Sequence, residues 1–241
     1  MILDVDAGNT RIKWRALAVS GERLAGGSAD AVDAFVEISR QVSAPTRVRI
    51  ASVRNPEFRA RLRESVMDHW GVVAEFAQSR EQVGEVRNAY AEPGHLGVDR
   101  WLAVLAAYKR ARGACCVLDA GSALTLDIVR RDGQHEGGYI VPGLTMQRAA
   151  LLERTAIPLA VTGQWGETDP GRSTVTAIHH GILDMVVSWA AEQHRARASQ
   201  ESVWFITGGD AEVLSDALAR RGVHCILVPE LVLEGLPLAL P

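Results

Sequence analysis

The stretch from Asp6 to Lys13 holds the side chains best suited to chemistry in this 241-residue chain. Gly8 lets backbone N–H groups approach an anion closely, and its polar neighbours add side-chain donors. An acid beside a phosphate needs a metal ion or water between them, so Asp6 indicates a nucleotide with Mg²⁺ rather than a plain anion site. The eight residues are Asp6, Ala7, Gly8, Asn9, Thr10, Arg11, Ile12 and Lys13.

The same stretch also fits a plain turn, since Asn and Gly are favoured between two antiparallel strands. It lacks the glycine spacing of a P-loop, and the residues after Thr10 alternate polar and apolar as a strand does. The sequence therefore predicts a hairpin that opens on a strand at the first residues of the chain. Whether its turn binds phosphate stays open on these residues alone.

A second acidic hairpin favours the phosphate-binding interpretation. Asp119 follows an apolar run and precedes Gly121, Ser122 and another alternating strand, 113 positions after Asp6 (119 − 6). Further along, an apolar strand ends in Thr207-Gly208-Gly209 before a predicted helix. Two acidic hairpins and a glycine turn in this order resemble the actin-like and sugar-kinase-like (ribonuclease H-like) ATPases. That resemblance implies an α/β fold of two similar domains with ATP in the cleft between them.

The segment Gly97-Val98-Asp99-Arg100 is the best catalytic candidate. Asp99 falls in the first turn of a predicted helix, where the helix dipole favours an ionised carboxylate. Such a carboxylate can accept the proton of a hydroxyl during phosphoryl transfer, and Arg100 can bind a substrate carboxylate through two hydrogen bonds. The alternative is an ordinary helix start with a surface arginine.

The elements around these residues alternate between strands and helices in both halves. The first half reads as two strands, a helix, a strand over 48–53, a helix from Asn55-Pro56, a short strand at 72–76, a long polar loop and a helix over 98–112. The second reads as strands at 114–119, 123–130 and 135–141, helices after Gly143 and near Ser173, a loop over 158–172, and a final strand, helix and strand. We place the boundary between domains 1–112 and 113–241.

Three further features allow two interpretations each. The glycines of Gly137-Gly138 and Gly143 fit either close approach of a ligand or subunit, or a bulge and a helix entry. Thr174 fits a substrate contact as well as a helix cap. Adjacent His179 and His180 diverge on a helix, which favours packing over metal binding.

Composition excludes several classes of protein. The chain has 26 basic and 29 acidic residues, a net charge of −3 and no basic tract, which argues against nucleic acid as a partner. It has no apolar run of membrane-spanning length and no signal-peptide pattern at its start, so we expect a cytoplasmic protein with no membrane partner. Three cysteines, Cys115, Cys116 and Cys225, sit in apolar strands and suit buried, reduced thiols.

Taken together, the motifs resemble type III pantothenate kinases. They cover residues 6 to 209 in order, and Glu234-Gly235-Leu236 resembles the closing segment of that family. One departure is Ser122, where the family usually has threonine, although a hydroxyl remains. The motifs are Asp6 to Lys13, Gly97 to Arg100, Asp119 to Ala123, Gly138 to Gly143 and Thr207 to Gly209.

The resemblance implies phosphorylation of pantothenate by ATP with Mg²⁺, the first step of coenzyme A synthesis, by a homodimer. Asp99 would be the general base, and Asp119 would hold a monovalent cation, K⁺ or NH₄⁺. Asp6 to Lys13 and Ser122 would bind ATP. The implied pantothenate-binding residues are Tyr90, Gly97, Val98, Asp99, Arg100 and Thr174.

Two alternatives differ in function. The first is another small-molecule kinase of the same superfamily, which a panel of acceptors would reveal. The second is a non-catalytic regulator of the Bvg accessory factor type. The presence of Asp99 argues against lost activity, and the absence of a basic patch argues against direct DNA binding.

Overall fold

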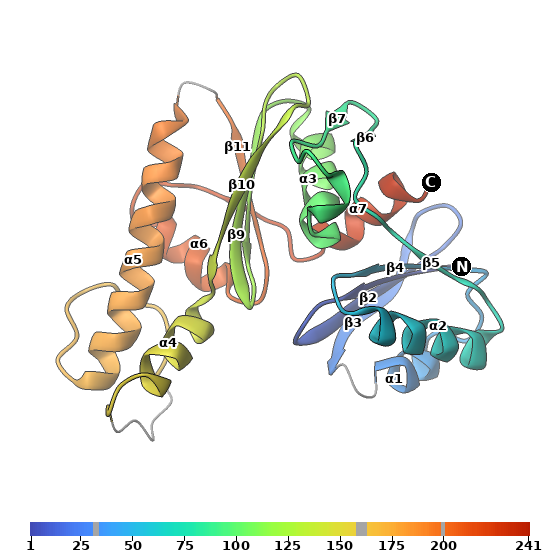
Figure 1. The fold of residues 1–241 in the computed structure, drawn as a ribbon, viewed down its shortest axis with the longest axis horizontal. Helices are drawn as coiled ribbons and strands as arrows, with labels where there is room; N and C mark the ends of the chain where they lie inside the picture. The colour runs from blue at the N-terminus through green and yellow to red at the C-terminus, as the bar shows by residue number, and fades with distance from the viewer. Residues whose placement is uncertain (31–33, 158–162, 199–200) are drawn as a thin grey trace. The chain divides into compact units, whose positions relative to one another are not determined.

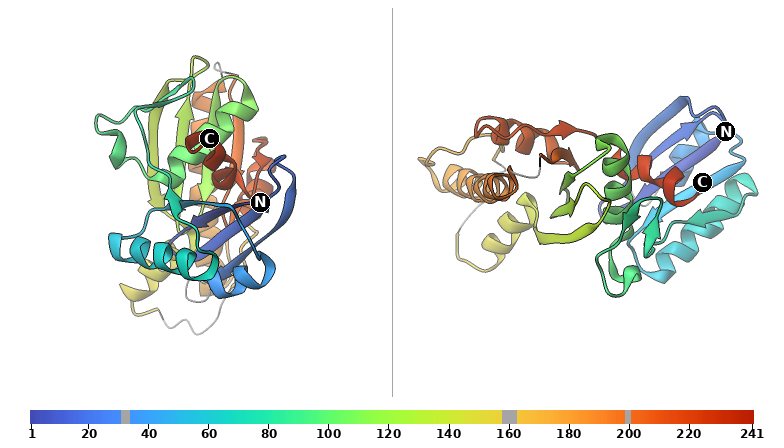
Figure 2. Two further views of the ribbon diagram at one scale, coloured as in Figure 1. Left: turned by 90° about the vertical axis from the view of Figure 1, so that its right-hand side faces the viewer. Right: turned by 90° about the horizontal axis from the view of Figure 1, so that it is seen from above.

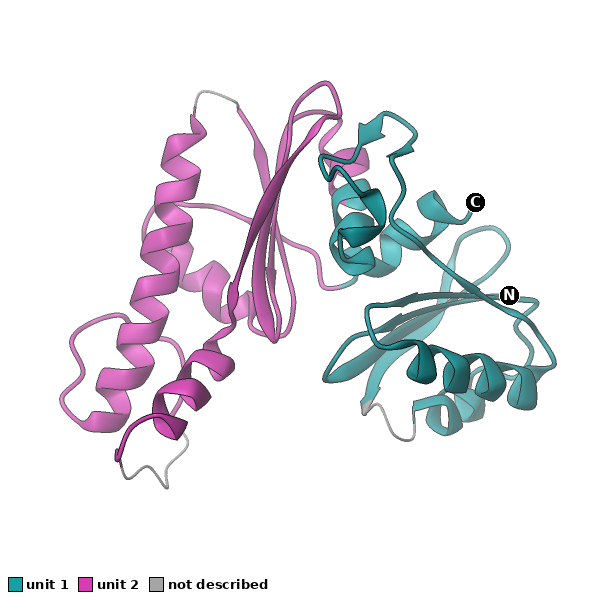
Figure 3. Ribbon diagram, in the orientation of Figure 1, with its two compact units in different colours: residues 1–106, 230–241 teal, residues 107–229 magenta. Residues whose placement is uncertain are grey.

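The structure is a computed structural model that describes residues 1–30, 34–157, 163–198 and 201–241. By its internal contacts the chain divides into two compact units (Figure 3). Unit 1 comprises Met1–Ala106 and Glu230–Pro241, and unit 2 comprises Ala107–Pro229. The chain thus returns to unit 1 for its last twelve residues (230 to 241). The predicted domain boundary between 112 and 113 stays a prediction.

A five-stranded sheet forms the centre of unit 1, in the order β3-β2-β1-β4-β5. Strands β1, β2 and β3 are antiparallel neighbours, whereas β4 and β5 continue the sheet in parallel. The predicted first hairpin is confirmed, but β3 was missed and β5 is shorter than the predicted 72–76. The strands are β1 (Ile2–Ala7), β2 (Arg11–Leu17), β3 (Arg23–Asp30), β4 (Arg47–Ser52) and β5 (Ala74–Phe76).

Helices cover both faces of this sheet (Figures 1 and 2). Alternate side chains of β1, Leu3, Val5 and Ala7, pack with α1 (Ala34–Gln41) and α2 (Pro56–Trp70) in one apolar core. Helix α2 begins where predicted, with Asn55 as its N-cap and Pro56 in its first turn. The opposite face carries α7 (Leu231–Ala239), which the sequence did not predict.

The long polar segment before α3 (Val98–Ala111) is ordered by its own hydrogen bonds. It contains the small hairpin of β6 (Gln82–Val83) and β7 (Val86–Arg87) and the short helix η1 (Pro93–His95). The side chain of Asn88 donates to the carbonyls of Arg80 and Pro93, and Ser79 donates to the carbonyl of Leu96 at 2.7 Å. These bonds close the segment on itself immediately before Asp99.

Unit 2 repeats the strand arrangement of unit 1. Its sheet has the order β10-β9-β8-β11-β12, again three antiparallel strands followed by two parallel ones. The correspondence places β8 where unit 1 has β1, and β9 where it has β2. The strands are β8 (Cys115–Ala120), β9 (Ala123–Val129), β10 (His135–Pro142), β11 (Val203–Thr207) and β12 (Ile226–Leu227).

The helices of unit 2 complete its core. Helix α5 (Thr174–Ala196) and α6 (Ala211–Ala219) bury apolar side chains against β8, β9 and β11, and α4 (Leu144–Glu153) packs on α5 (Figure 1). The predicted helices after Gly143 and Ser173 are confirmed. Residues 163–172 form no helix or strand, as predicted, and 158–162 lie outside the described residues.

The cysteines are packed rather than reactive. Cys115 and Cys116 are fully buried in β8, and burial raises the pKa of the Cys116 thiol to about 12. Cys225 precedes β12 instead of lying within it, which corrects the prediction, and burial raises its pKa to about 11. Within the described ranges no helix is long and apolar enough to cross a membrane.

Candidate active site

The first hairpin sorts its side chains into two faces. Asp6 lies directly opposite Lys13 across β1 and β2, and Ala7 lies opposite Ile12. Ala7 and Ile12 are fully buried, so they anchor the hairpin in the core and can offer a ligand only backbone groups. Asp6 and Lys13 are partly buried on the other face. An acid and an amine therefore project side by side at the base of the turn.

The turn itself is tight and exposed. A side chain at Gly8 would place its Cβ 3.1 Å from the carbonyl oxygen of Arg11, closer than most real contacts. The polar residues Asn9, Thr10 and Arg11 are all exposed. These polar side chains are therefore accessible to a ligand.

The second hairpin, between β8 and β9, has the same layout. Asp119 is partly buried at the end of β8, opposite Thr125, and the backbone N–H of Gly121 donates to the carbonyl of Ala123 at 3.2 Å. Ser122 is exposed at its tip. Strands β1 and β8 thus each end in an aspartate and an alanine, and a glycine and a polar residue follow.

Two glycine segments pack directly on this second hairpin. Gly143 donates its N–H to the carbonyl of Ser122, and a Cβ at Gly143 would lie 2.3 Å from the carbonyl oxygen of Gly121. Gly208 has a φ of +103°, and its Cβ would lie 2.4 Å from the carbonyl carbon of Ala120. The strand, the helix entry and the glycine turn that the sequence singled out therefore meet at one place in unit 2.

By contrast, Gly137 forms a β-bulge. Its φ is +97°, and the pairing of β10 with β9 shifts between His135 and Gly137. The structural alternative thus holds for both glycines, because Gly137 forms the bulge and Gly143 is the N-cap of α4.

At the start of α3, Gly97 leaves room for the carboxylate of Asp99. A Cβ at Gly97 would lie 2.7 Å from Oδ1 of Asp99, and that oxygen accepts the backbone N–H of Arg100 at 2.7 Å. Asp99 stands in the first turn of the helix, where the dipole favours its charged form. The glycine and the bond together fix where the carboxylate lies.

Arg100 and Tyr90 belong to the same cluster in unit 1. Arg100 is 6% exposed, and its Nη1 donates to the hydroxyl oxygen of Tyr90 at 3.0 Å. Tyr90 is itself held by its backbone N–H, which donates to the side chain of Asn88. A buried guanidinium bonded to a phenol can bind an anionic group, and the carboxylate of the preceding residue, Asp99, can accept a proton.

Thr174 is the exposed first residue of α5. The helix cap belongs to Ser173, whose hydroxyl accepts the N–H of Thr176 in a capping box. Capping therefore does not require the Thr174 hydroxyl. His179 and His180 bond the carbonyls of Val175 and Asp169, so packing accounts for both.

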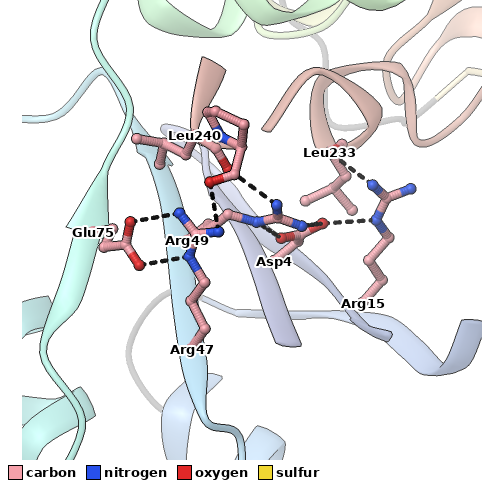
Figure 4. A network of polar contacts seen from close by, with 8 residues as sticks. Asp4, Arg15, Arg47, Arg49, Glu75, Leu233 and Leu240 are labelled. Carbon is pink, nitrogen blue, oxygen red and sulfur yellow. Dashed lines mark hydrogen bonds and ion pairs between the residues drawn. The ribbon is translucent and has the colours of Figure 1, made fainter. Parts of the chain in front are cut away.

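The sequence interpretation missed one charged cluster. Asp4 is fully buried in β1 between Arg15 of β2 and Arg49 of β4 (Figure 4). A signal was present at Asp4, which stands between Leu3 and Val5 in the apolar run at the start of the sequence. Among the described residues, no group of three or more metal-binding side chains is found.

The fold recurs in solved structures of kinases and related proteins. A Baf-family protein of Campylobacter jejuni, described as a transcriptional activator, has a TM-score of 0.61 at 19% identity, covering 98% of this chain and 95% of that one. A ROK-family glucokinase of Streptomyces griseus in complex with glucose and AMPPNP has a TM-score of 0.51 at 12% identity, covering 99% and 98%. The chain thus has the two-domain fold of the actin-like ATPase and sugar-kinase superfamily.

Sequence comparison narrows this class to one family. Residues 2–196 match the family described as type III pantothenate kinase. The type III pantothenate kinase of Pseudomonas aeruginosa strain LESB58 is 38% identical over 250 residues, covering 100% of this chain and 99% of that protein. The chain belongs to the type III pantothenate kinase family. It is therefore an ATP-using phosphotransferase of a family that acts on pantothenate in coenzyme A biosynthesis.

Proposed function

We propose that this chain transfers the γ-phosphoryl group of ATP to the primary hydroxyl of pantothenate, with Asp99 as the general base. The product is 4′-phosphopantothenate, the first intermediate of coenzyme A synthesis. The observation that carries the proposal is the fixed carboxylate of Asp99 beside Gly97 and the buried Arg100. Family membership favours this activity over the regulatory alternative.

Residues 6–13 would bind ATP at the first hairpin, and Ser122 would contact it from the second. The exposure of the polar residues Asn9, Thr10 and Arg11 supports this assignment. Lys13 would offset phosphate charge from its position opposite Asp6. Ala7 and Ile12 would contribute through their backbone, since their side chains lie in the core.

Pantothenate would bind at the start of α3. Arg100 would pair with its carboxylate, with the hydroxyl of Tyr90 holding the guanidinium in place. Gly97 and Val98 would line the site with backbone, and Thr174 would donate its hydroxyl. Burial of Arg100 supports the assignment, since a desolvated guanidinium binds a carboxylate more strongly than an exposed one.

The carboxylates fit the cations that the family implies. Oxygen ligands suit Mg²⁺ and K⁺, and Asp6 and Asp119 each stand half-buried at a strand end beside a glycine turn. Asp6 would hold Mg²⁺ through water, and Asp119 would hold K⁺ or NH₄⁺. When bound, these cations offset the negative charge of the triphosphate.

In the proposed reaction, residues of the protein position the two substrates and accept a proton. Asp99 accepts the proton of the attacking hydroxyl while the hairpin donors and Lys13 hold the phosphates in line. The N–H of Arg100 keeps Asp99 Oδ1 in place at 2.7 Å. Most of the rate enhancement then comes from fixed geometry and fixed charge.

We also propose a cytoplasmic homodimer. Unit 2 exposes apolar side chains on neighbouring elements, among them Tyr139 of β10, Met146 of α4 and Met185 of α5. The rings of Tyr139 and Trp189 meet edge to face, with their centroids 5.9 Å apart. This contact joins β10 to α5 in one surface. Such a surface suits contact with a second copy.

A coupled ADP-release assay with pantothenate, with and without K⁺, tests the activity. We expect turnover that depends on both. Other hydroxyl acceptors should react at least tenfold more slowly, and equal or faster turnover of another acceptor would identify a different small-molecule kinase.

Asp99→Asn tests the base. A general base contributes about 10²- to 10⁴-fold, so kcat should fall by at least about a hundredfold while ATP affinity changes less than about threefold. Asp68→Asn, a neutralised carboxylate exposed on α2, is the control and should keep normal turnover. Turnover near the wild-type rate in Asp99→Asn would refute the assignment.

A further inference from the structure

The buried charges of unit 1 form one cluster across three strands. Arg15 and Arg49 are the direct neighbours of Asp4 on β2 and β4. The carboxylate of Asp4 accepts Nε of Arg15 at 3.1 Å, and Nε and Nη2 of Arg49 at 2.7 and 3.2 Å. Asp6 lies two residues further along β1, on the same face and about 7 Å away. The cluster therefore adjoins the proposed ATP hairpin.

Both arginines extend from Asp4 to the last helix of the chain, as Figure 4 shows. Nη2 of Arg15 donates to the carbonyl of Leu233 at 2.8 Å, and Nη1 of Arg49 donates to that of Leu240 at 3.1 Å. Leu233 is four residues before Pro237, which has no N–H to offer it. Leu240 caps the helix end, where carbonyls also lack helical partners. The two arginines thus donate hydrogen bonds to carbonyls for which α7 has no helical N–H partner.

On its other side α7 touches the helix that carries Asp99. A Cβ at Gly235 would lie 2.2 Å from the carbonyl oxygen and 2.7 Å from the Cα of Leu102 in α3. Leu102 is three residues, about one helical turn, after Asp99. The backbones of α7 and α3 are thus in direct contact, which glycine alone permits at this position.

Buried ion pairs seldom stabilise a fold more than apolar packing would, because both charges lose their hydration. A network of three buried charges that ends on two particular carbonyls is therefore better explained by the geometry it fixes. It holds α7 at a set distance from β1, and Gly235 sets the distance from α7 to α3.

We propose that α7 positions the catalytic base, with Gly235 and Arg15 as positioning residues that hold Asp99 in register with the Asp6 hairpin. The proposal rests on the proposed function. Neither residue touches a substrate in this account. They act through Leu102 and Asp4, and both ends of the link lie within unit 1.

The first test is Gly235→Ala. Alanine is more favourable than glycine in a helix interior, so any loss of activity comes from the contact with Leu102 rather than from a weaker α7. We expect kcat per folded molecule to fall at least about tenfold, since a displacement of about 1 Å can cost a hundredfold. The Kd for ATP should change less than about threefold. Circular dichroism gives the folded fraction, and the assays run well below the unfolding temperature.

The second test is Arg15→Lys, which also serves if Gly235→Ala does not fold. Lysine keeps a positive charge beside Asp4 but lacks the planar fork that reaches Leu233 as well. We expect kcat to fall about threefold or more with the same preserved ATP affinity. Arg23→Ala is the control, because it removes an exposed ion pair between Arg23 and Glu230 before α7, and kcat should stay within about twofold.

The outcomes separate the two proposals. If the wild-type protein turns over pantothenate and both variants lower the unfolding temperature without lowering kcat, α7 is a structural helix and the positioning role is wrong. If the wild-type protein transfers no phosphate to pantothenate, the proposed function fails and the positioning role fails with it.

Discussion

At the scale of single residues, the spacing of Gly97, Asp99 and Arg100 at the start of α3 decides where the carboxylate of Asp99 lies. The sequence Gly-x-Asp-Arg places a residue without a side chain two positions before an acid. In the fold, the carboxylate of Asp99 occupies the space that a side chain at Gly97 would need. The same carboxylate accepts the backbone N–H of Arg100. The glycine therefore matters for the position of the carboxylate as much as for the backbone.

Gly97→Ala should displace Asp99, because the new Cβ would lie 2.7 Å from Oδ1. We expect kcat for pantothenate to fall about ten- to a hundredfold with little change in thermal stability, since the carboxylate can rotate away. Steady-state kinetics with both substrates measure the effect. Gly94→Ala is the matched control, because nothing lies within 4 Å of a Cβ there. Equal rates for the two variants would contradict this account.

At the scale of elements, the two sheets repeat one arrangement. In each, an aspartate is the second-last residue of the strand that pairs with an antiparallel strand on one side and a parallel strand on the other. In unit 2 the end of that parallel strand, β11, turns back on the hairpin through Gly208. The position of the second hairpin thus depends on a turn some 90 residues away in the sequence (208 − 119).

Gly208→Ala should loosen this junction. The φ of +103° disfavours any side chain, and the Cβ would meet the backbone of Ala120. We expect a loss of about 2 kcal/mol or more, hence a thermal midpoint lower by about 4–8 °C, together with weaker ATP binding. Differential scanning fluorimetry and nucleotide titration measure both. Gly209→Ala has open space for its Cβ and should behave as wild type. A midpoint unchanged by Gly208→Ala would show that the junction tolerates a side chain.

At the scale of the whole molecule, the chain forms two units of similar design, and its last residues return to the first. The exposed apolar residues of β10, α4 and α5 all belong to unit 2. Because β10 and α4 both contact α5, these exposed side chains lie on neighbouring elements, which suits contact with a second copy.

Met185→Glu should weaken the proposed dimer, because it places a charge on a side chain that is 57% exposed in α5. Light scattering should give a wild-type mass about twice 26.1 kDa and a shift of the variant toward the monomer at low micromolar concentration. Val19→Glu makes the same change at an exposed site in unit 1 and should leave the mass unchanged. A monomeric wild-type protein would exclude the homodimer.

The sequence by itself determined the hairpins, most strands and helices, and the family, because these depend on local spacing and on residue types in order. The helix start at Asn55-Pro56 and the first-turn position of Asp99 needed no distant contact. Only the tertiary structure revealed the Asp4 cluster, α7 and the close contact of Gly235 with Leu102. These depend on pairings between residues far apart in the sequence, and a buried charge shows its purpose only once its partners are known.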